Sequence, residues 1–202
     1  MKPENIIFDV GGVLVGFRWH DMLTDYGMTD AQADVFGPKI FEDELWPELD
    51  RERIPYWDLV ELYVKKYPEM EKDLRFFFTY TERMVVPRPQ VWERVVRLHE
   101  AGFKLYLLSN YSSVMFEKHT GGAPFREVMD GGIVSYMVHE VKPEQNIYRH
   151  LFDKYSLDPA KCLFLDDRED NIQTGESLGM PGIVIRSEAH VCQVLDELLE
   201  RA

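Results

Sequence analysis

Short, continuously apolar runs of strand length, each followed by a stretch with a helical pattern, recur along this chain. The runs cover residues 5–10, 103–109, 162–166 and 182–186. Unbroken rather than alternating apolarity is typical of strands buried on both faces, as in a parallel sheet with helices on each side. Amphipathic stretches follow at residues 89–101, 144–155, 169–178 and 188–201. This alternation predicts a doubly wound α/β domain with a parallel sheet.

One region interrupts the alternation. Between about residues 17 and 86 the pattern favours helices and offers no buried strand. The expected helices cover residues 19–26, 30–36, 55–67 and 70–83. We therefore expect a helical insertion at residues 17–86, after the first strand, in an α/β core formed by residues 1–16 and 87–202.

Charge and composition narrow the range of partners and compartments. The formal net charge of −13 disfavours binding to nucleic acid or to an anionic membrane through the overall field. No apolar run approaches the ~18 residues of a membrane-spanning helix, and the first residues lack a signal-peptide pattern. The two cysteines, Cys162 and Cys192, fall in a predicted strand and a predicted helix. We expect both to be reduced thiols in a cytoplasmic protein.

Four short segments combine polar residues with the ends of predicted elements. They contain Asp9 with Gly11 and Gly12; Ser109 with Asn110; Lys142 before Pro143; and Asp166, Asp167, Asp170 and Asn171. Singly, each has an ordinary explanation, because aspartates often cap helices and acid pairs often lie at helix N-termini. Sheets of this class, however, place their sites at the carboxyl ends of the strands. Together the four segments predict a functional site there.

The motifs FDVGGVL, LLSN, VKPE and LDDREDN resemble those of the haloacid dehalogenase-like (HAD) hydrolase superfamily, over essentially the whole chain. Within it the chain is similar to the branch that contains bacterial sugar-1-phosphate phosphatases. The resemblance implies a Rossmann-like core with residues 17–86 as a small helical cap. It also implies Mg²⁺-dependent hydrolysis of a small phosphorylated metabolite, with a sugar phosphate favoured, by a monomer or weak homodimer.

The resemblance assigns a role to each motif. Asp9 would be the nucleophile that forms an aspartyl-phosphate, and Mg²⁺ would be bound by Asp9, Asp166, Asp167 and the carbonyl of Gly11. Ser109 and Lys142 would hold the phosphoryl oxygens, with Asn110, Gly11 and Gly12 also beside the phosphate, and Asn171 and Asp170 would support the acid pair. These roles suit the chemistry, because a carboxylate can approach a phosphate dianion only when a hard cation neutralises the charge between them.

One position departs from the family pattern. Most phosphatases of this superfamily carry a second aspartate two residues after the nucleophile, whereas this chain has Gly11. That aspartate acts as a general acid and base, a contribution of typically 10²–10⁴-fold. Three interpretations are open: the leaving groups need little protonation, a cap residue such as His20 or Glu44 substitutes, or catalysis is lost. Arg18 and Trp46 are further cap residues that could face the site.

Two alternative functions follow from the same departure. A metal-free hydrolase of the dehalogenase type also lacks the second acid, but it has no use for the clustered acids of LDDREDN. A non-catalytic binding or regulatory protein would have no reason to keep a cluster of mutually repelling carboxylates. A magnesium-dependent phosphatase is therefore the function that the sequence favours.

Overall fold

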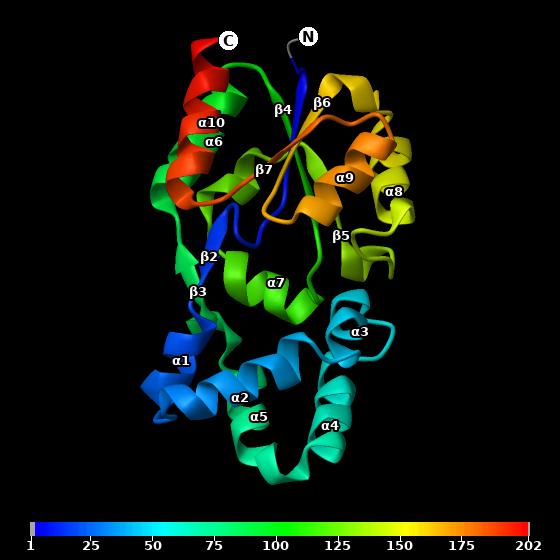
Figure 1. Ribbon diagram of the computed structural model, residues 1–202. Helices are drawn as coiled ribbons and strands as arrows, with labels where there is room; N and C mark the ends of the chain where they lie inside the picture. The colour runs from blue at the N-terminus through cyan, green and yellow to red at the C-terminus, as the bar shows by residue number, and fades with distance from the viewer. Residues whose placement is uncertain (1–2, 202) are drawn as a thin grey trace.

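A five-stranded parallel sheet forms the centre of the computed structural model, which describes residues 3–201 (Figure 1). Its strands, in spatial order, are β5 (Gly131–Val134), β4 (Lys104–Ser109), β1 (Asn5–Phe8), β6 (Cys162–Asp166) and β7 (Gly182–Val184). Strand β1 lies in the middle, with Phe8 beside Leu107 of β4 and Leu165 of β6. All neighbouring strands are parallel, so their carboxyl ends share one edge of the sheet.

Both faces of the sheet are buried, which explains the unbroken apolar runs. One face presents Ile6 and Phe8 to a core shared with α6 (Pro89–Glu100) and α10 (Glu188–Glu200). The other presents Ile7 to a core shared with α8 (Gln145–Tyr155) and α9 (Glu169–Ser177). Figure 1 shows the two helix pairs on opposite sides of the sheet. Helix α7 (Ser113–Thr120) lies between the sheet and the helices formed by residues 19–79.

The flanking helices owe their position to amphipathic patterns. In α8 the buried side chains are Ile147, Tyr148 and Leu151, spaced so that they lie on one helical face. Fully burying an aliphatic or aromatic side chain of this size contributes roughly 1.5–3 kcal/mol, so this face is enough to hold the helix on the sheet.

A cap made of helices is inserted after the first strand, as expected. It comprises α1 (Trp19–Tyr26), α2 (Asp30–Phe41), α3 (Leu45–Arg51), α4 (Tyr56–Lys66) and α5 (Glu71–Thr79). The chain enters and leaves it through β2 (Val15–Phe17) and β3 (Val85–Pro87), which pair antiparallel. Short 3₁₀ helices complete the chain: η1 (Pro68–Met70), η2 (Thr81–Met84), η3 (Pro124–Val128), η4 (Ser135–Met137) and η5 (Pro159–Lys161). The predicted fold class, a doubly wound α/β core with a helical cap, is confirmed.

Some local details differ from the expectation. Helix α2 continues to Phe41 through Gly37 and Pro38. The Trp19 ring packs against Gly37, where a β-carbon would lie 2.4 Å from the ring. The short elements β5, α3 and α7 were not predicted. In α4, Trp57 and Leu62 are exposed.

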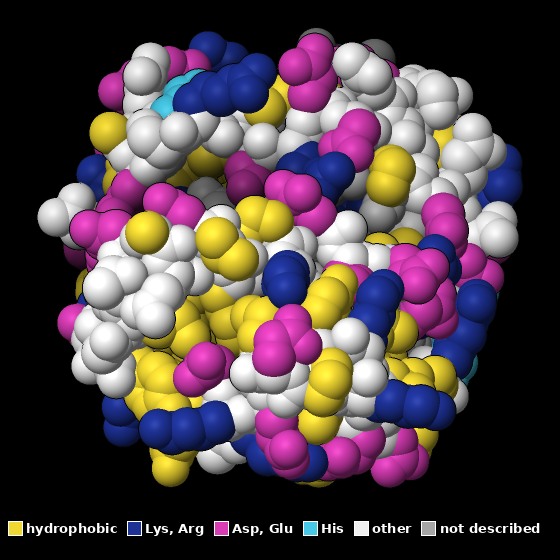
Figure 2. All heavy atoms as spheres, turned by 60° about the horizontal axis from the view of Figure 1, so that its bottom comes forward, with side chains coloured by type: hydrophobic (Ala, Val, Ile, Leu, Met, Phe, Trp, Pro, Cys, Tyr) yellow, Lys and Arg dark blue, Asp and Glu magenta, His cyan; other side chains and the backbone are white. Residues whose placement is uncertain are grey.

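Surface and thiol features agree with part of the sequence picture. Both Cys162 and Cys192 are free. Within residues 3–201 the helices are too short or too polar to cross a membrane. The face that Figure 2 brings forward, at the cap end, mixes acidic, basic and hydrophobic side chains. This face therefore offers no broad field of one sign to a polyanion.

Candidate active site

The carboxyl edge of the sheet gathers five polar side chains from separate parts of the sequence. Asp9 follows β1, Ser109 ends β4, Asp166 ends β6, and Asp167 follows it; Lys142 comes from the loop before α8. Except for Asp167 these residues are buried, although each is polar or charged. Buried polar groups of this kind are expected to be satisfied by one another, and the contacts below show that they are.

Asp9 is held in place by three donors. Its Oδ1 accepts hydrogen bonds from the Ser109 hydroxyl at 2.6 Å and from the Val10 amide at 2.7 Å. The Lys142 ammonium lies 3.0 Å from the same oxygen. All three contacts involve Oδ1; within residues 3–201 the other carboxylate oxygen has no hydrogen-bond or ion-pair partner, which leaves it available to a ligand.

Lys142 bridges two carboxylates, since its Nζ also lies 2.6 Å from Oδ2 of Asp166. Asn110 fixes the lysine backbone: its Oδ1 accepts from the Lys142 amide at 2.8 Å, and its Nδ2 donates to the Lys142 carbonyl at 2.9 Å. The structure therefore uses the Asn110 amide to position Lys142, whereas the sequence predicted a contact with phosphate.

Asp166 is fully buried. Its carboxylate accepts from Asn171 Nδ2 at 3.0 and 3.1 Å and from the Arg168 amide at 2.8 Å. Asn171 thus contacts the first carboxylate of the acid pair directly. The carboxylate of Asp170 instead pairs with the exposed Arg168 guanidinium at 2.8 Å.

Asp167 approaches the loop after β1 closely. A β-carbon on Gly12 would lie 2.2 Å from the Asp167 carboxylate, and Gly12 has a φ of +70°, which favours glycine. Ligand oxygens of Asp9, Asp166 and Asp167 lie within 4.8 Å of one another. Three carboxylates beside a single ammonium form a donor set suited to a hard divalent cation. Asn171 Oδ1, buried and without a hydrogen bond to the described residues, adds a free acceptor nearby.

The charges in the cluster shift its pKa values in a consistent way. Burial raises the pKa of Asp9 to about 7, with Lys142 opposing the rise and Asp166 and Asp167 adding to it. Burial would lower the pKa of Lys142, but Asp166 and Asp9 outweigh that effect and raise it. The lysine therefore stays charged, and a further cation would help to keep the Asp9 carboxylate ionised.

The place of the missing second aspartate is filled by an aromatic ring. A β-carbon on Gly11 would lie 2.8 Å from Cε2 of Phe17, which comes from β2. The φ angle of Gly11 is not positive, so its backbone would accept a side chain. The obstacle to an acidic side chain at this position is the Phe17 ring.

A cavity of about 590 Å³ opens between this cluster and the cap. Its floor includes Asp9, Lys142 and Asp167. The walls are largely apolar and are lined by Phe17, Trp19, Phe41, Trp46, Pro47, Met84, Tyr111, Met115, Val141 and Pro143. Arg51 and Glu144 also line it, but they form a pair with Nη2–Oε1 at 2.5 Å, and Arg168 pairs with Asp170. A ligand bound at the carboxylates would thus extend into an apolar chamber.

The cap residues singled out by sequence differ in their relation to this cavity. Trp46 lines it. His20 instead pairs with Asp34 at 3.2 Å, and the exposed Glu44 pairs with Lys66 at 3.2 Å. Arg18 pairs with Asp25 at 2.6 Å. These three are outside the cavity lining.

Sequence reasoning missed Asp50, a buried acid of α3 that does line the cavity. It also missed Arg88, whose guanidinium donates to the Val13 carbonyl at 3.0 Å and to the Gly12 carbonyl, and so fixes the loop behind Asp9. Neither residue lies in one of the four motifs, so the sequence marks them only as two charged residues among many.

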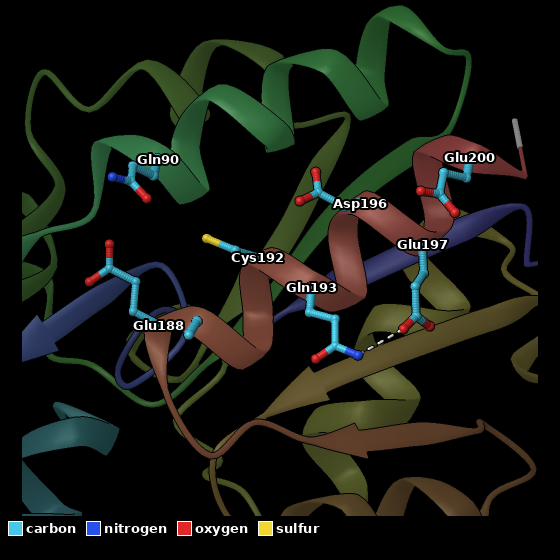
Figure 3. Close-up of a pocket in the computed structure, with 8 residues that line it drawn as sticks. Gln90, Glu188, Cys192, Gln193, Asp196, Glu197 and Glu200 are labelled. Carbon is cyan, nitrogen blue, oxygen red and sulfur yellow. Dashed lines mark hydrogen bonds between the residues drawn. The ribbon is translucent and has the colours of Figure 1, made fainter.

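A second hollow lies between α6 and α10, and its lining contains none of the residues of the carboxylate cluster (Figure 3). It is lined by Glu188, Asp196, Glu197 and Glu200 together with Gln90, Cys192 and Gln193. Three of its acids are already engaged, since Asp196 pairs with Arg94, Glu188 lies 3.9 Å from Arg88, and Glu197 accepts from Gln193. An acidic lining of this kind repels phosphate and other anions.

Comparison with known proteins places this geometry in context. The family model of the haloacid dehalogenase-like hydrolases matches residues 3–179. The chain is 22% identical over 194 residues to a sesquiterpene phosphatase from Aspergillus oryzae, covering 96% of this chain and 95% of that protein. It is 24% identical over 192 residues to a D-ribitol-5-phosphate phosphatase from Bacteroides thetaiotaomicron, covering 87% and 88%.

The fold has solved counterparts as well. A HAD family enzyme from Bacteroides thetaiotaomicron, solved with magnesium and inorganic phosphate, is 19% identical and superimposes with a TM-score of 0.71. The match covers 90% of this chain and 93% of that one. This likeness shows that the two chains share a fold.

Proposed function

The chain belongs to the haloacid dehalogenase-like hydrolase family, and we propose that it is a Mg²⁺-dependent phosphatase that hydrolyses a small phosphomonoester through an aspartyl-phosphate on Asp9. The observation that carries the proposal is the convergence of Asp9, Asp166 and Asp167 within 4.8 Å, beside a buried Lys142. The two phosphatases and the magnesium–phosphate complex described above support it.

Each residue of the cluster has its own role in the proposed reaction. Asp9, Asp166 and Asp167 would hold Mg²⁺, which when bound neutralises charge between the phosphate and the nucleophile. The Asp9 oxygen that lacks a protein donor attacks phosphorus, while Ser109 and Lys142 keep the carboxylate oriented and ionised. Lys142 also offers its charge to the phosphoryl oxygens as negative charge develops on them.

The cavity walls favour an apolar alcohol as the esterified group. A sugar needs several hydrogen-bonding partners, but the arginines and the glutamate of the lining are already paired with one another or with Asp170, and within residues 3–201 the cap adds one unpaired carboxyl, that of Asp50. Aromatic and aliphatic side chains make up most of the remaining wall. The sugar phosphate favoured by the motifs is therefore a poorer fit than an aryl, long-chain or isoprenoid ester. The relative from Aspergillus oryzae is named a sesquiterpene phosphatase, which agrees with an isoprenoid ester.

We expect apolar phosphate esters to outpace sugar phosphates by about 50-fold or more in kcat/KM, because burying ~100 Å² of apolar surface contributes about 2.5 kcal/mol. The measurement is phosphate release from decyl phosphate, 1-naphthyl phosphate, glucose 1-phosphate and ribitol 5-phosphate, with Mg²⁺ and with EDTA. Trp46→Ala should reduce the preference, and Trp57→Ala, on an exposed cap surface, should not.

The results with the four esters test the phosphatase activity and the preference for apolar esters separately. Faster turnover of the sugar phosphates would contradict the apolar preference and leave the phosphatase intact. No phosphate release from any ester, or release that is unaffected by EDTA, would contradict the proposed function and favour a non-catalytic or metal-free protein.

Metal binding should also stabilise the fold. A ligand at 100 times its Kd that binds only the folded state adds about 2.7 kcal/mol. We expect Mg²⁺ to raise the melting temperature of the natural protein, and Asp167→Asn to abolish most of that rise because it removes one carboxylate of the donor set. Asp170→Asn is the matched control, since its side chain pairs with Arg168 instead. Equal shifts in the Asp167 variant and the natural protein would show that the cation binds elsewhere.

A further inference from the structure

The site described above lacks a group that could give a proton to the departing alcohol. Gly11 has no side chain, and the Phe17 ring fills the space beside it. Lys142 is committed to two carboxylates, which raise its pKa and make it a poor acid. An alkoxide would therefore have to leave unprotonated unless another residue supplies the proton.

Asp50 on α3 lies in the right chamber. It lines the cavity together with Asp9, Gly11 and Lys142, and it is only 8% exposed. Among residues 3–201 its carboxylate has no hydrogen-bond or ion-pair partner, whereas its backbone carbonyl accepts from the Ser135 hydroxyl at 2.6 Å. A buried, unpaired carboxyl group facing a cavity is costly to maintain without a function.

Helix α3 is fastened to the core, so Asp50 is held over the site. Arg51 forms a bidentate pair with Glu144, at 2.9 and 2.5 Å. Glu52 accepts from the Ser113 hydroxyl at 2.6 Å, and His139 Nδ1 lies 2.8 Å from the Arg51 carbonyl. These contacts flank Asp50 on its C-terminal side and position it relative to the carboxyl edge of the sheet.

We propose that Asp50 is the acid that protonates the leaving oxygen and then the base that activates the hydrolytic water, in place of the aspartate that is absent at Gly11. This inference rests on the proposed phosphatase activity. It names a cap residue, rather than a residue of the first motif, as the source of the proton.

The electrostatic surroundings suit that role. Burial raises the pKa of Asp50 to about 7, the charge of Asp9 adds to the rise, and Lys142 and Arg51 oppose it. A pKa near the working pH lets one group donate a proton in one step and accept one in the next. By contrast, hydrogen bonding to Arg51 lowers the pKa of Glu144, another carboxyl of the lining, to about 2, so Glu144 stays ionised.

Both steps balance. In the first, an Asp9 oxygen bonds to phosphorus, the bond between phosphorus and the ester oxygen breaks, and that oxygen takes the proton of Asp50 to leave as a neutral alcohol. In the second, water attacks the phosphorus of the aspartyl-phosphate, its proton passes to the Asp50 carboxylate, and the bond from phosphorus to Asp9 breaks. Inorganic phosphate leaves, and Asp50 is protonated again.

The test is the dependence of kcat/KM on leaving-group pKa in Asp50→Asn and the natural protein. With Mg²⁺, we expect Asp50→Asn to lose on the order of 10²–10³-fold on decyl phosphate but only a few-fold on 4-nitrophenyl phosphate, whose phenolate leaves without help. Glu44→Gln, an exposed cap residue paired with Lys66, is the control and should match the natural protein on both esters.

A second readout needs no variant. In the natural protein kcat/KM for decyl phosphate should fall as pH rises through the pKa of Asp50, which burial raises above the usual range of a carboxyl group, and the fall should be much weaker for 4-nitrophenyl phosphate. Equal losses on both esters in Asp50→Asn, or equal pH profiles, would assign Asp50 a structural role and overturn the inference. Absence of Mg²⁺-dependent release from either ester in the natural protein would overturn the proposed function itself.

Discussion

Asp9→Asn is expected to abolish turnover, with a loss on the order of 10⁴-fold or more in kcat, because an amide is a poor nucleophile for phosphorus. The fold should survive. The amide is nearly isosteric with the carboxylate, and its oxygen can still accept from Ser109 and the Val10 amide. The measurement is steady-state phosphate release, with circular dichroism and a melting curve to verify the fold.

A trapping experiment distinguishes a nucleophile from a metal ligand. Beryllium fluoride with Mg²⁺ should bind against Asp9 in the natural protein and raise its melting temperature further than Mg²⁺ alone. Asp9→Asn should lose that additional rise. Asp170→Asn is a suitable control, since Asp170 pairs with the exposed Arg168 guanidinium rather than with the carboxylate cluster. Natural-like turnover in Asp9→Asn would end the aspartyl-phosphate mechanism.

The parts of the site that could be predicted from sequence are those tied to strand ends. Continuous apolar runs locate β1, β4 and β6, and the parallel arrangement brings the residues after them to one edge. Asp9, Ser109 and Asp166 converge for this reason, and Asp167 follows directly. Strand ends do not locate Lys142, because its ammonium reaches the cluster from a loop. It could be predicted only from its motif.

The parts that could not be predicted depend on tertiary contacts of the cap. Helix α3 has seven residues, includes Pro47, and lacks a side-chain cap, so it carries no periodic signal. Its position is set by contacts far along the chain, such as Arg51 with Glu144. For that reason the sequence suggested His20 and Glu44 as substitute acids and did not single out Asp50.

Lys142→Met is expected to lower kcat/KM by on the order of 10²–10³-fold, the scale of removing one donor from a site of growing charge. It should also destabilise the protein. Lys142 lies 3.0 Å from Asp9 and 2.6 Å from Asp166, and removing one partner from a buried ion pair costs about 3–5 kcal/mol. Lys104→Met is the control, because its exposed pair with Asp130 should contribute about 0–1 kcal/mol.

The stability loss in Lys142→Met should depend on pH, which separates an electrostatic role from simple packing. Burial already raises the pKa of Asp9 from 3.8 to about 7, and Lys142 is the main group that opposes the rise. A carboxyl whose pKa is raised on folding favours the folded state at low pH and loses that contribution as pH rises through the folded-state pKa. Without the lysine the folded-state pKa rises further, so the penalty should be smaller at pH 5 than at pH 8. Urea unfolding in EDTA at the two pH values measures this difference. An equal penalty at both would mean that the side chain of Lys142 stabilises the fold by its volume rather than by its charge.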